Sequence, residues 1–179
     1  MNNSTNVPLD LNHAPKILFL FGLSGAGKSY VGNLIGEMAD WYVYHADDDL
    51  TDDMLLALKE QRSFTEQMRD DFFPVVAERI LALAKTKKRI VVTQGVYKQR
   101  HRDYLLAAIP EMEMLCVDAS NQFIEQRLGH RSNGISNASA EALRRDFELP
   151  DNKTKVITNQ HGAAEIIQQL NDCYLKPRL

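Results

Sequence analysis

The sequence predicts an α/β fold in which helices cover both faces of a five-stranded, mainly parallel sheet. Two observations predict this three-layer arrangement. Short apolar runs alternate along the whole chain with amphipathic stretches of helical period. The first apolar run, Ile17 to Phe21, is unbroken, as is typical of a parallel strand buried on both faces, and a glycine-rich turn follows it at once.

The elements of the first half follow from their apolar patterns. After the glycine-rich turn, Val31, Leu34, Ile35 and Met38 form one helical stripe. Pro74 is expected to kink or restart the third helix, because proline has no backbone N–H to donate. The predicted elements are strands over 17–21 and 42–44 and helices over 28–38, 50–59 and 64–85.

The second half continues the alternation to the end of the chain. Its first strand is rich in β-branched residues, which favour strands. A polar segment over 132–139, which contains Gly134, interrupts the pattern. The predicted elements are strands over 89–93, 112–117 and 155–158 and helices over 99–108, 121–128, 140–147 and 163–174.

The length of the chain, 179 residues, predicts one domain with a substantial core. Residues 1–14 are polar and are expected to be a flexible N-terminal segment, followed by a single domain over 15–179. The N-terminus lacks the pattern of a signal peptide, and no apolar run approaches the roughly 20 residues that span a bilayer. Cys116 and Cys173 are interpreted as reduced thiols. A cytoplasmic protein is therefore expected.

The net charge of the chain indicates which classes of partner to expect. The formal net charge is -3, whereas nucleic-acid binders are more often basic on one face. We therefore expect no nucleic-acid partner and no membrane partner. The five histidines show no metal-ligand spacing. The chain is expected to act on a small molecule, as a monomer or a homodimer.

The glycine-rich turn fits the phosphate-loop (P-loop) pattern G-x-x-x-x-G-K-[ST] from Gly22 to Ser29. Its glycines permit positive φ, and its N–H groups and the following helix N-terminus attract phosphate oxygens. Lys28 is expected to neutralise the β- and γ-phosphates of ATP, and the Ser29 hydroxyl to coordinate Mg²⁺. The residues predicted to bind the nucleotide are Gly22, Ser24, Gly25, Ala26, Gly27, Lys28, Ser29, Tyr30 and Arg127.

An acidic run, Asp47 to Asp49, follows the second predicted strand and is expected at the same sheet edge as the phosphate loop. Asp47 is a candidate for the metal site together with Ser29. Asp47 and Asp49 are candidates for orienting an acceptor hydroxyl or accepting its proton. The alternative is that these acids stabilise the start of the helix predicted near Leu50.

Several basic residues suggest an acceptor site and a lid. Arg127 and Arg131 end a predicted helix, and Arg131 is a candidate for neutralising the transferred phosphate. The alternative for both is a solvated helix face. Gly95 and Lys98, after the third strand, are candidates for binding an acceptor and its negative group. The alternatives are a surface lysine at 98 and, for Arg69, a surface ion pair with Glu66.

With these residues in place, the chain resembles the gluconate kinase and shikimate kinase group from about Lys16 to Leu170. The phosphate loop, the acids at Asp47 and Asp49, and the position of Arg69 carry the resemblance. Further matches are Lys98, Arg102-Asp103, Arg127, Arg131 and Phe147-Glu148. The chain departs from gluconate kinases after Asp49, in the predicted lid, and where Gly95-Val96-Tyr97 replaces their Ser-Ala-Leu.

The resemblance implies a P-loop NTPase fold of the nucleoside-kinase type, with a mobile lid near 130–140 and an acceptor-binding helical region near 48–73. It also implies Mg·ATP as the phosphoryl donor, a small polyol acid as the acceptor, and a role for Arg69 in binding that acceptor. The predicted function is thus transfer of the γ-phosphoryl group to a hydroxyl of a sugar acid. The alternatives are a kinase for nucleosides, nucleotides or polynucleotide ends, and a nucleotide-binding regulatory module without acceptor chemistry.

Overall fold

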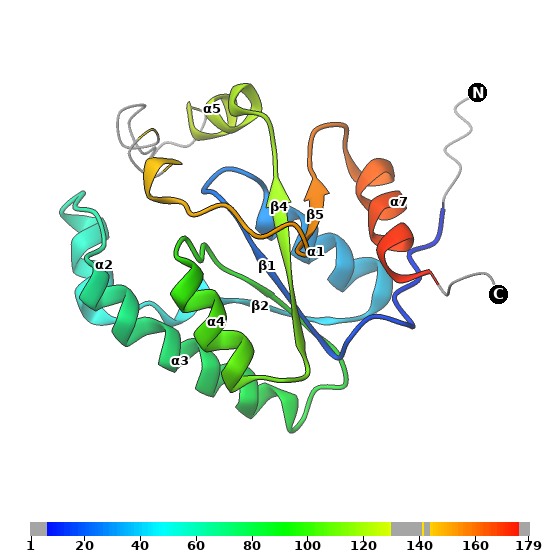
Figure 1. Cartoon of the computed structure of the whole chain (residues 1–179), viewed down its shortest axis with the longest axis horizontal. Coiled ribbons are helices and arrows are strands. Elements are labelled where there is room, and N and C mark those ends of the chain that lie inside the picture. Colours follow the sequence, from blue (N-terminus) through cyan, green and yellow to red (C-terminus); the bar gives the residue numbers. More distant parts are fainter. Residues whose placement is uncertain (1–6, 130–140, 142–143, 176–179) are drawn as a thin grey trace.

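The computed structural model of the chain describes residues 7–129, 141 and 144–175. It confirms the predicted sheet of five strands, all of them parallel, in the order β2-β3-β1-β4-β5 (Figure 1). The strands are β1 Ile17–Phe21, β2 Tyr42–His45, β3 Ile90–Thr93, β4 Met112–Asp118 and β5 Lys155–Thr158.

Helices cover both faces of this sheet and complete the predicted three-layer fold. The helices α3 and α4 lie on one face, and α1 and α7 lie on the other (Figure 1). The helices are α1 Lys28–Ala39, α2 Asp52–Lys59, α3 Glu66–Ala84, α4 Gln99–Ala108, α5 Asn121–Gly129 and α7 Ala163–Tyr174, with a short 3-10 turn, η1, over Ala46–Asp49.

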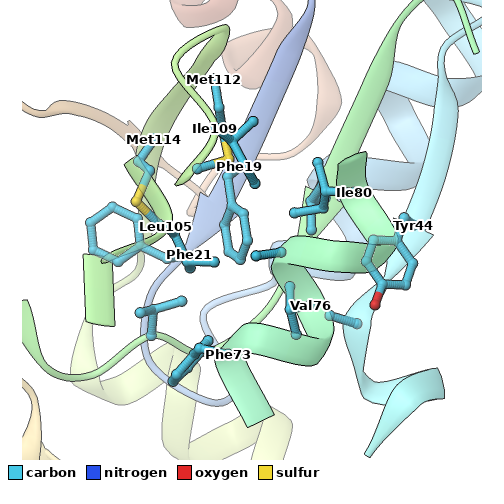
Figure 2. Close-up of a cluster of buried hydrophobic side chains, with 14 of the residues drawn as sticks. Phe19, Phe21, Tyr44, Phe73, Val76, Ile80, Leu105, Ile109, Met112 and Met114 are labelled. Carbon is cyan, nitrogen blue, oxygen red and sulfur yellow. The ribbon is translucent and has the colours of Figure 1, made fainter. Parts of the chain in front are cut away.

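Two buried clusters follow from the alternation of side chains along the strands. In β1, Phe19 and Phe21 belong to the cluster beneath α3 and α4 (Figure 2), whereas Leu18 and Leu20 belong to the cluster beneath α1 and α7. All five residues of β1 are buried. The central strand therefore has little freedom, and the loop that follows it begins from a fixed point.

Pro74 lies inside α3, and the helix runs without a restart from Glu66 to Ala84. The expected restart at Pro74 is therefore wrong. A proline in a helix removes one backbone hydrogen bond, and the apolar face around it compensates for that loss. Buried residues before and after the proline hold the helix against the sheet; these are Phe72, Phe73, Val76, Ala77 and Ile80.

The residues before β1 pack closely against the last helix. Leu11 and Ala14 are buried, and Asn171 of α7 accepts from Asp10 N at 2.8 Å and donates to Pro8 O at 2.9 Å. The polar composition of this segment gave no indication of these contacts. The predicted lid over 130–140, and Arg131 within it, lie outside the described residues. Among the described residues, no helix is long and apolar enough to cross a membrane.

Candidate nucleotide and acceptor site

The phosphate loop leaves the carboxyl end of β1 through Gly22, whose φ is 149°. A Cβ atom placed on Gly22 would lie 2.2 Å from the carbonyl oxygen of Val117 in β4, which is backbone and cannot rotate away. Glycine is therefore required both by φ and by the close approach of the neighbouring strand. The loop is thus pressed against the sheet edge where ligands bind in open α/β folds.

Two side chains hold the phosphate loop through its carbonyl oxygens. Asn159, directly after β5, is buried and donates to Ala26 O at 3.0 Å, and its amide nitrogen would lie 2.0 Å from a Cβ atom on Gly27. Arg127 of α5 donates to the carbonyls of Gly25 and Ala26 at 3.2 and 3.1 Å and to that of Asn159 at 3.0 Å. These contacts use carbonyl oxygens of the loop and none of its N–H groups.

Lys28 and Ser29 open helix α1, directly after the left-handed Gly27 (φ 99°). The Lys28 ammonium donates to the carbonyls of Gly22 and Leu23 at 3.1 and 2.9 Å, so it is folded over the loop. Ser29 and Tyr30 are exposed. A cation, a hydroxyl and a helix N-terminus thus follow one another directly after the loop, the combination that favours a phosphate with its magnesium ion.

The acidic run lies at the same sheet edge as the loop, although β3 separates β2 from β1. Asp47 is exposed, and its carboxylate accepts from Gln94 Nε2 at 2.9 Å. Gln94 in turn accepts from Gly95 N at 2.6 Å, so the end of β3 links Asp47 to Gly95. A Cβ atom on Gly95 would lie 3.1 Å from the Tyr97 ring, which makes this turn tight.

Asp49 is already engaged in a bidentate ion pair with Arg79. Arg79 of α3 donates to both of its carboxylate oxygens, at 2.9 and 3.0 Å, and the Tyr44 hydroxyl donates at 2.7 Å. These hydrogen bonds, the one from Arg79 above all, lower the pKa of Asp49. Asp49 therefore stays ionised and fastens η1 to α3. The following helix, α2, is capped by Thr51, whose side chain accepts from Met54 N, and not by the acidic run.

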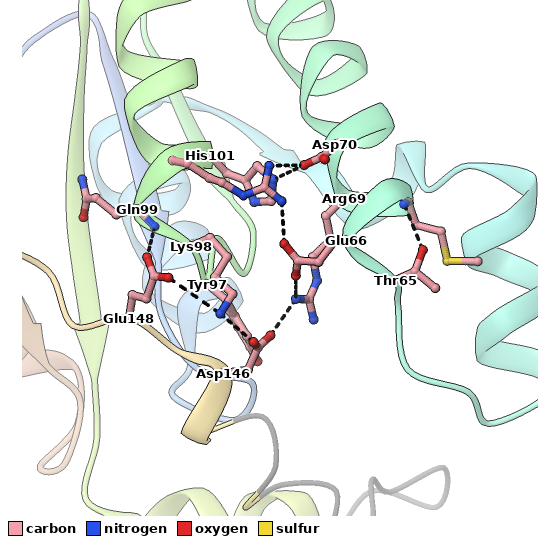
Figure 3. A network of polar contacts seen from close by, with 12 residues as sticks. Thr65, Glu66, Arg69, Asp70, Tyr97, Lys98, Gln99, His101, Asp146 and Glu148 are labelled. Atoms are coloured by element: carbon pink, nitrogen blue, oxygen red, sulfur yellow. Dashed lines mark hydrogen bonds and ion pairs between the residues drawn. The ribbon is translucent and has the colours of Figure 1, made fainter.

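The two candidate acceptor-binding cations meet on one carboxylate (Figure 3). Arg69 of α3 lies 2.6 Å from Asp146, and Lys98, at the start of α4, lies 2.7 Å from the other oxygen of Asp146. Arg69 also pairs with Glu66 at 3.0 Å, and Lys98 with Glu148 at 3.7 Å. The Arg69 side chain is only 13% exposed, so this is more than the surface ion pair considered as an alternative.

Tyr97 joins this cluster to the phosphate loop. Its hydroxyl accepts from Ser24 N at 3.2 Å, and its ring lies beneath the Arg69 guanidinium at 5.7 Å. Burial raises the pKa of Tyr97, which therefore keeps its proton and remains a donor. Sequence reasoning treated Tyr97 only as a departure from a family pattern. The feature of the sequence that could have indicated a role for Tyr97 in the site is its position two residues after Gly95, at the edge of the loop.

The segment that carries Asp146 is docked onto the start of α4. The Phe147 ring meets Tyr97 edge-on, with centroids 5.5 Å apart, and Glu148 N donates to Tyr97 O at 2.9 Å. Arg102, which is 2% exposed, donates to Glu148 O at 2.6 Å and lies over the rings of Phe21 and Phe147. The position of Asp146 is therefore fixed by its neighbours.

Among the described residues, no three His, Cys, Asp or Glu side chains gather into a metal site. The magnesium of a nucleotide complex needs no such cluster, because phosphate oxygens and water supply most of its ligands. An exposed Ser29 hydroxyl beside the loop and an exposed Asp47 carboxylate at the same edge fit that chemistry. Hard oxygen donors of this kind suit Mg²⁺.

Comparison with known proteins begins with sequence. No protein-family model matches the chain. A probable gluconokinase of Mus musculus is 27% identical over 93 residues, which cover 52% of this chain and 50% of the mouse protein. The match thus spans about half the length of that relative.

Comparison of structures covers nearly the whole chain. A gluconokinase from Sinorhizobium meliloti 1021 superposes with a TM-score of 0.76 at 21% identity, over 87% of this chain and 89% of that one. A sugar kinase from Janibacter sp. HTCC2649 superposes with a TM-score of 0.77 at 17% identity, over 90% and 94%. The chain therefore has the fold of the P-loop small-molecule kinases, and the resemblance predicted from its sequence is confirmed.

Proposed function

We propose that this protein transfers the γ-phosphoryl group of ATP to a hydroxyl of a sugar acid. The observation that carries the proposal is the hydrogen bond from Ser24 N to the Tyr97 hydroxyl. It joins a complete phosphate loop to a cluster in which Arg69 and Lys98 bind a carboxylate. The proposed donor site and the proposed site for an anionic acceptor are thus adjacent.

On the donor side, the loop N–H groups and the N-terminus of α1 would hold the phosphates, with Lys28 neutralising charge as the γ-phosphoryl group leaves. When bound with ATP through Ser29 and Asp47, Mg²⁺ would neutralise further charge on the phosphate oxygens. Arg127, which braces the loop, would border the nucleotide. Arg131 stays a candidate for contacting the transferred phosphate.

On the acceptor side, Arg69 and Lys98 would bind the carboxylate of the acid, and Gly95 would let the polyol approach the backbone. The acceptor oxygen would form a bond to Pγ as the bond from Pγ to the β–γ bridging oxygen breaks, releasing ADP. Its proton would pass to Asp47. Asp49 is a weaker candidate for this role, because Arg79 and Tyr44 occupy its carboxylate. Positioning and charge neutralisation supply most of the catalysis in this chemistry.

The test is ADP release with Mg·ATP against a panel of gluconate, other sugar acids, shikimate, adenylylsulfate and nucleosides. Turnover of about 1–100 per second with a sugar acid is expected. Lys28→Ala should lower it by on the order of a hundredfold or more, as for other lost charge-stabilising groups. Lys88→Ala, at the opposite edge of the sheet, is the matched control and should leave turnover unchanged.

A nucleotide-binding module without acceptor chemistry is the second candidate. The observation in its favour is that carboxylates of the chain itself already occupy both acceptor-side cations. ATP binding combined with only slow, acceptor-independent ADP release across the panel would support it and contradict the kinase proposal. Turnover with nucleosides alone would instead point to a nucleoside kinase. Localisation in the cytoplasm is proposed with either function.

A further inference from the structure

The cluster around Asp146 is a network of ion pairs that joins α3, the start of α4 and the segment around Asp146, and it includes Arg100, which pairs with Glu66. Two cations, Arg69 and Lys98, lie among the carboxylates of Glu66, Asp146 and Glu148. Asp146 makes the two shortest of these contacts, one to each cation. The favourable position for an anion between Arg69 and Lys98 is therefore taken by a side chain of the protein.

The Asp146 carboxylate is held in this position from two sides. The docked residues Phe147 and Glu148 follow it, and its own oxygens receive hydrogen bonds from both cations. Although partial burial raises the pKa of Asp146, the hydrogen bonds from Lys98 and Arg69 lower it by more. The group is therefore ionised at neutral pH and occupies the subsite as a charge.

We propose that Asp146 is a selectivity residue whose carboxylate stands in the place of an acceptor's carboxylate. The inference rests on the proposed function, since it concerns the same acceptor site. A sugar acid binds between Arg69 and Lys98 only by displacing Asp146, so the affinity for anionic acceptors is set by this exchange. A neutral polyol does not need the two cations and is not subject to the competition. Asp146 therefore reduces the preference of the site for acids over neutral polyols.

The test is calorimetric binding to the full chain of two matched probes, D-gluconate and sorbitol, which differ in the presence of a carboxylate. In Asp146→Asn the amide keeps the size of the side chain and removes its charge. We expect this variant to bind gluconate at least about tenfold more tightly than the wild type, because charged hydrogen bonds to Arg69 and Lys98 become available. Sorbitol binding should not change.

Glu125→Gln is the matched control. Glu125 of α5 pairs at 3.2 Å with Arg144, which lies in the same segment as Asp146, but Glu125 does not touch Arg69 or Lys98. It should bind gluconate like the wild type. Asp146→Ser provides a second uncharged variant in case the amide perturbs folding.

The proposal is overturned by unchanged or undetectable gluconate binding in both uncharged variants. An equal gain for sorbitol, or an equal gain in Glu125→Gln, overturns it as well, because either would indicate a looser site or a general charge effect. These outcomes are separate from the fate of the proposed function, which depends on ADP release by the wild type. A kinase that uses a neutral acceptor would retain its activity while this inference failed.

Discussion

At the scale of single residues, the structure assigns tasks that residue type alone does not reveal. Asn159 and Arg127 both turn toward carbonyl oxygens of the phosphate loop. Each hydrogen bond of this kind stabilises the loop modestly, whereas a buried carbonyl or amide left without a partner would cost more. The loop is consequently held in shape before any phosphate arrives, which lowers the ordering that binding requires.

Tyr97 is the residue for which the structure makes the sharpest prediction about catalysis. Tyr97→Phe keeps the ring that packs on Phe147 and removes the hydroxyl that meets Ser24 N. Loss of one hydrogen bond of about 1 kcal/mol predicts a roughly fivefold fall in kcat. The KM for the acceptor should change little. Steady-state kinetics with the accepted substrate provide the measurement, and Tyr104→Phe, an exposed tyrosine of α4, is the control. Unchanged kcat in Tyr97→Phe would limit Tyr97 to packing.

Gly22 allows a prediction about stability. In Gly22→Ala the new methyl group would meet the Val117 carbonyl at 2.2 Å, at a φ of 149° that alanine rarely adopts. Strain and overpacking together predict a loss of at least about 2 kcal/mol in the free energy of unfolding. Urea denaturation measures this loss. In Gly129→Ala, where a Cβ atom would have no neighbour within 4 Å, the stability should not decrease. Equal stability of the two variants would contradict the geometry at Gly22.

At the scale of elements, ion pairs connect the segments that surround the site. Asp49 fastens η1 to α3 through Arg79, and Asp146 fastens its own segment to α3 and α4 through Arg69 and Lys98. Asp70 of α3 meets His101 of α4 at 2.7 Å. Arg100 of α4 also pairs with Glu66 and Asp70. The helix α3 is therefore joined by polar contacts to η1, to α4 and to the segment around Asp146, while its apolar face packs on the sheet. Acid should loosen these connections before it affects the apolar core.

Asp49 shows how this acid sensitivity can be measured. Its pKa is lowered in the folded protein from an ordinary value of 3.8. The resulting stability is present above that ordinary value and is lost as the pH falls through the lowered, folded-state pKa. We expect Asp49→Asn to reduce the dependence of unfolding free energy on pH below about pH 4. Urea denaturation at a series of pH values tests this. The control is Asp48→Asn, since Asp48 lies in the same turn and is exposed. An identical pH dependence of the unfolding free energy in the wild type and Asp49→Asn would contradict the stabilising role of ionised Asp49.

The elements were largely predictable because their signals are local. Helix α4, strand β5 and helix α7 have the predicted bounds. Pro110 follows the end of α4, and a polar turn that contains Gly162 separates β5 from α7. The restart expected as one possibility at Pro74 was wrong because tertiary packing of α3 overrides a local helix breaker. In the site, the phosphate loop could be predicted from its spacing. The roles of Asn159, Tyr97 and Asp146 could not, because each depends on a partner far along the chain.

At the scale of the whole molecule, the order β2-β3-β1-β4-β5 places β1 in the middle of the sheet, with buried clusters on both sides. The loop that follows β1 is therefore anchored at the end of the buried central strand. The residues proposed to receive the acceptor come instead from α3, the start of α4 and the segment around Asp146. The proposed donor site is thus built on the central strand, whereas the proposed acceptor site is assembled from separate elements, each held by polar contacts that a ligand can replace.

This division predicts how nucleotide binding affects the whole molecule. Because the loop is continuous with β1 and is braced by α5 and Asn159, Mg·ATP should stabilise the folded domain as a unit. At a concentration of about 100 times the Kd, binding contributes about 2.7 kcal/mol, which predicts a rise of roughly 5–10 °C in Tm for a domain of this size. Thermal unfolding monitored by circular dichroism measures the rise. Lys28→Ala should lose most of it at the same concentration, whereas Lys88→Ala should retain it. An equal rise in all three proteins would place the bound nucleotide somewhere other than the phosphate loop.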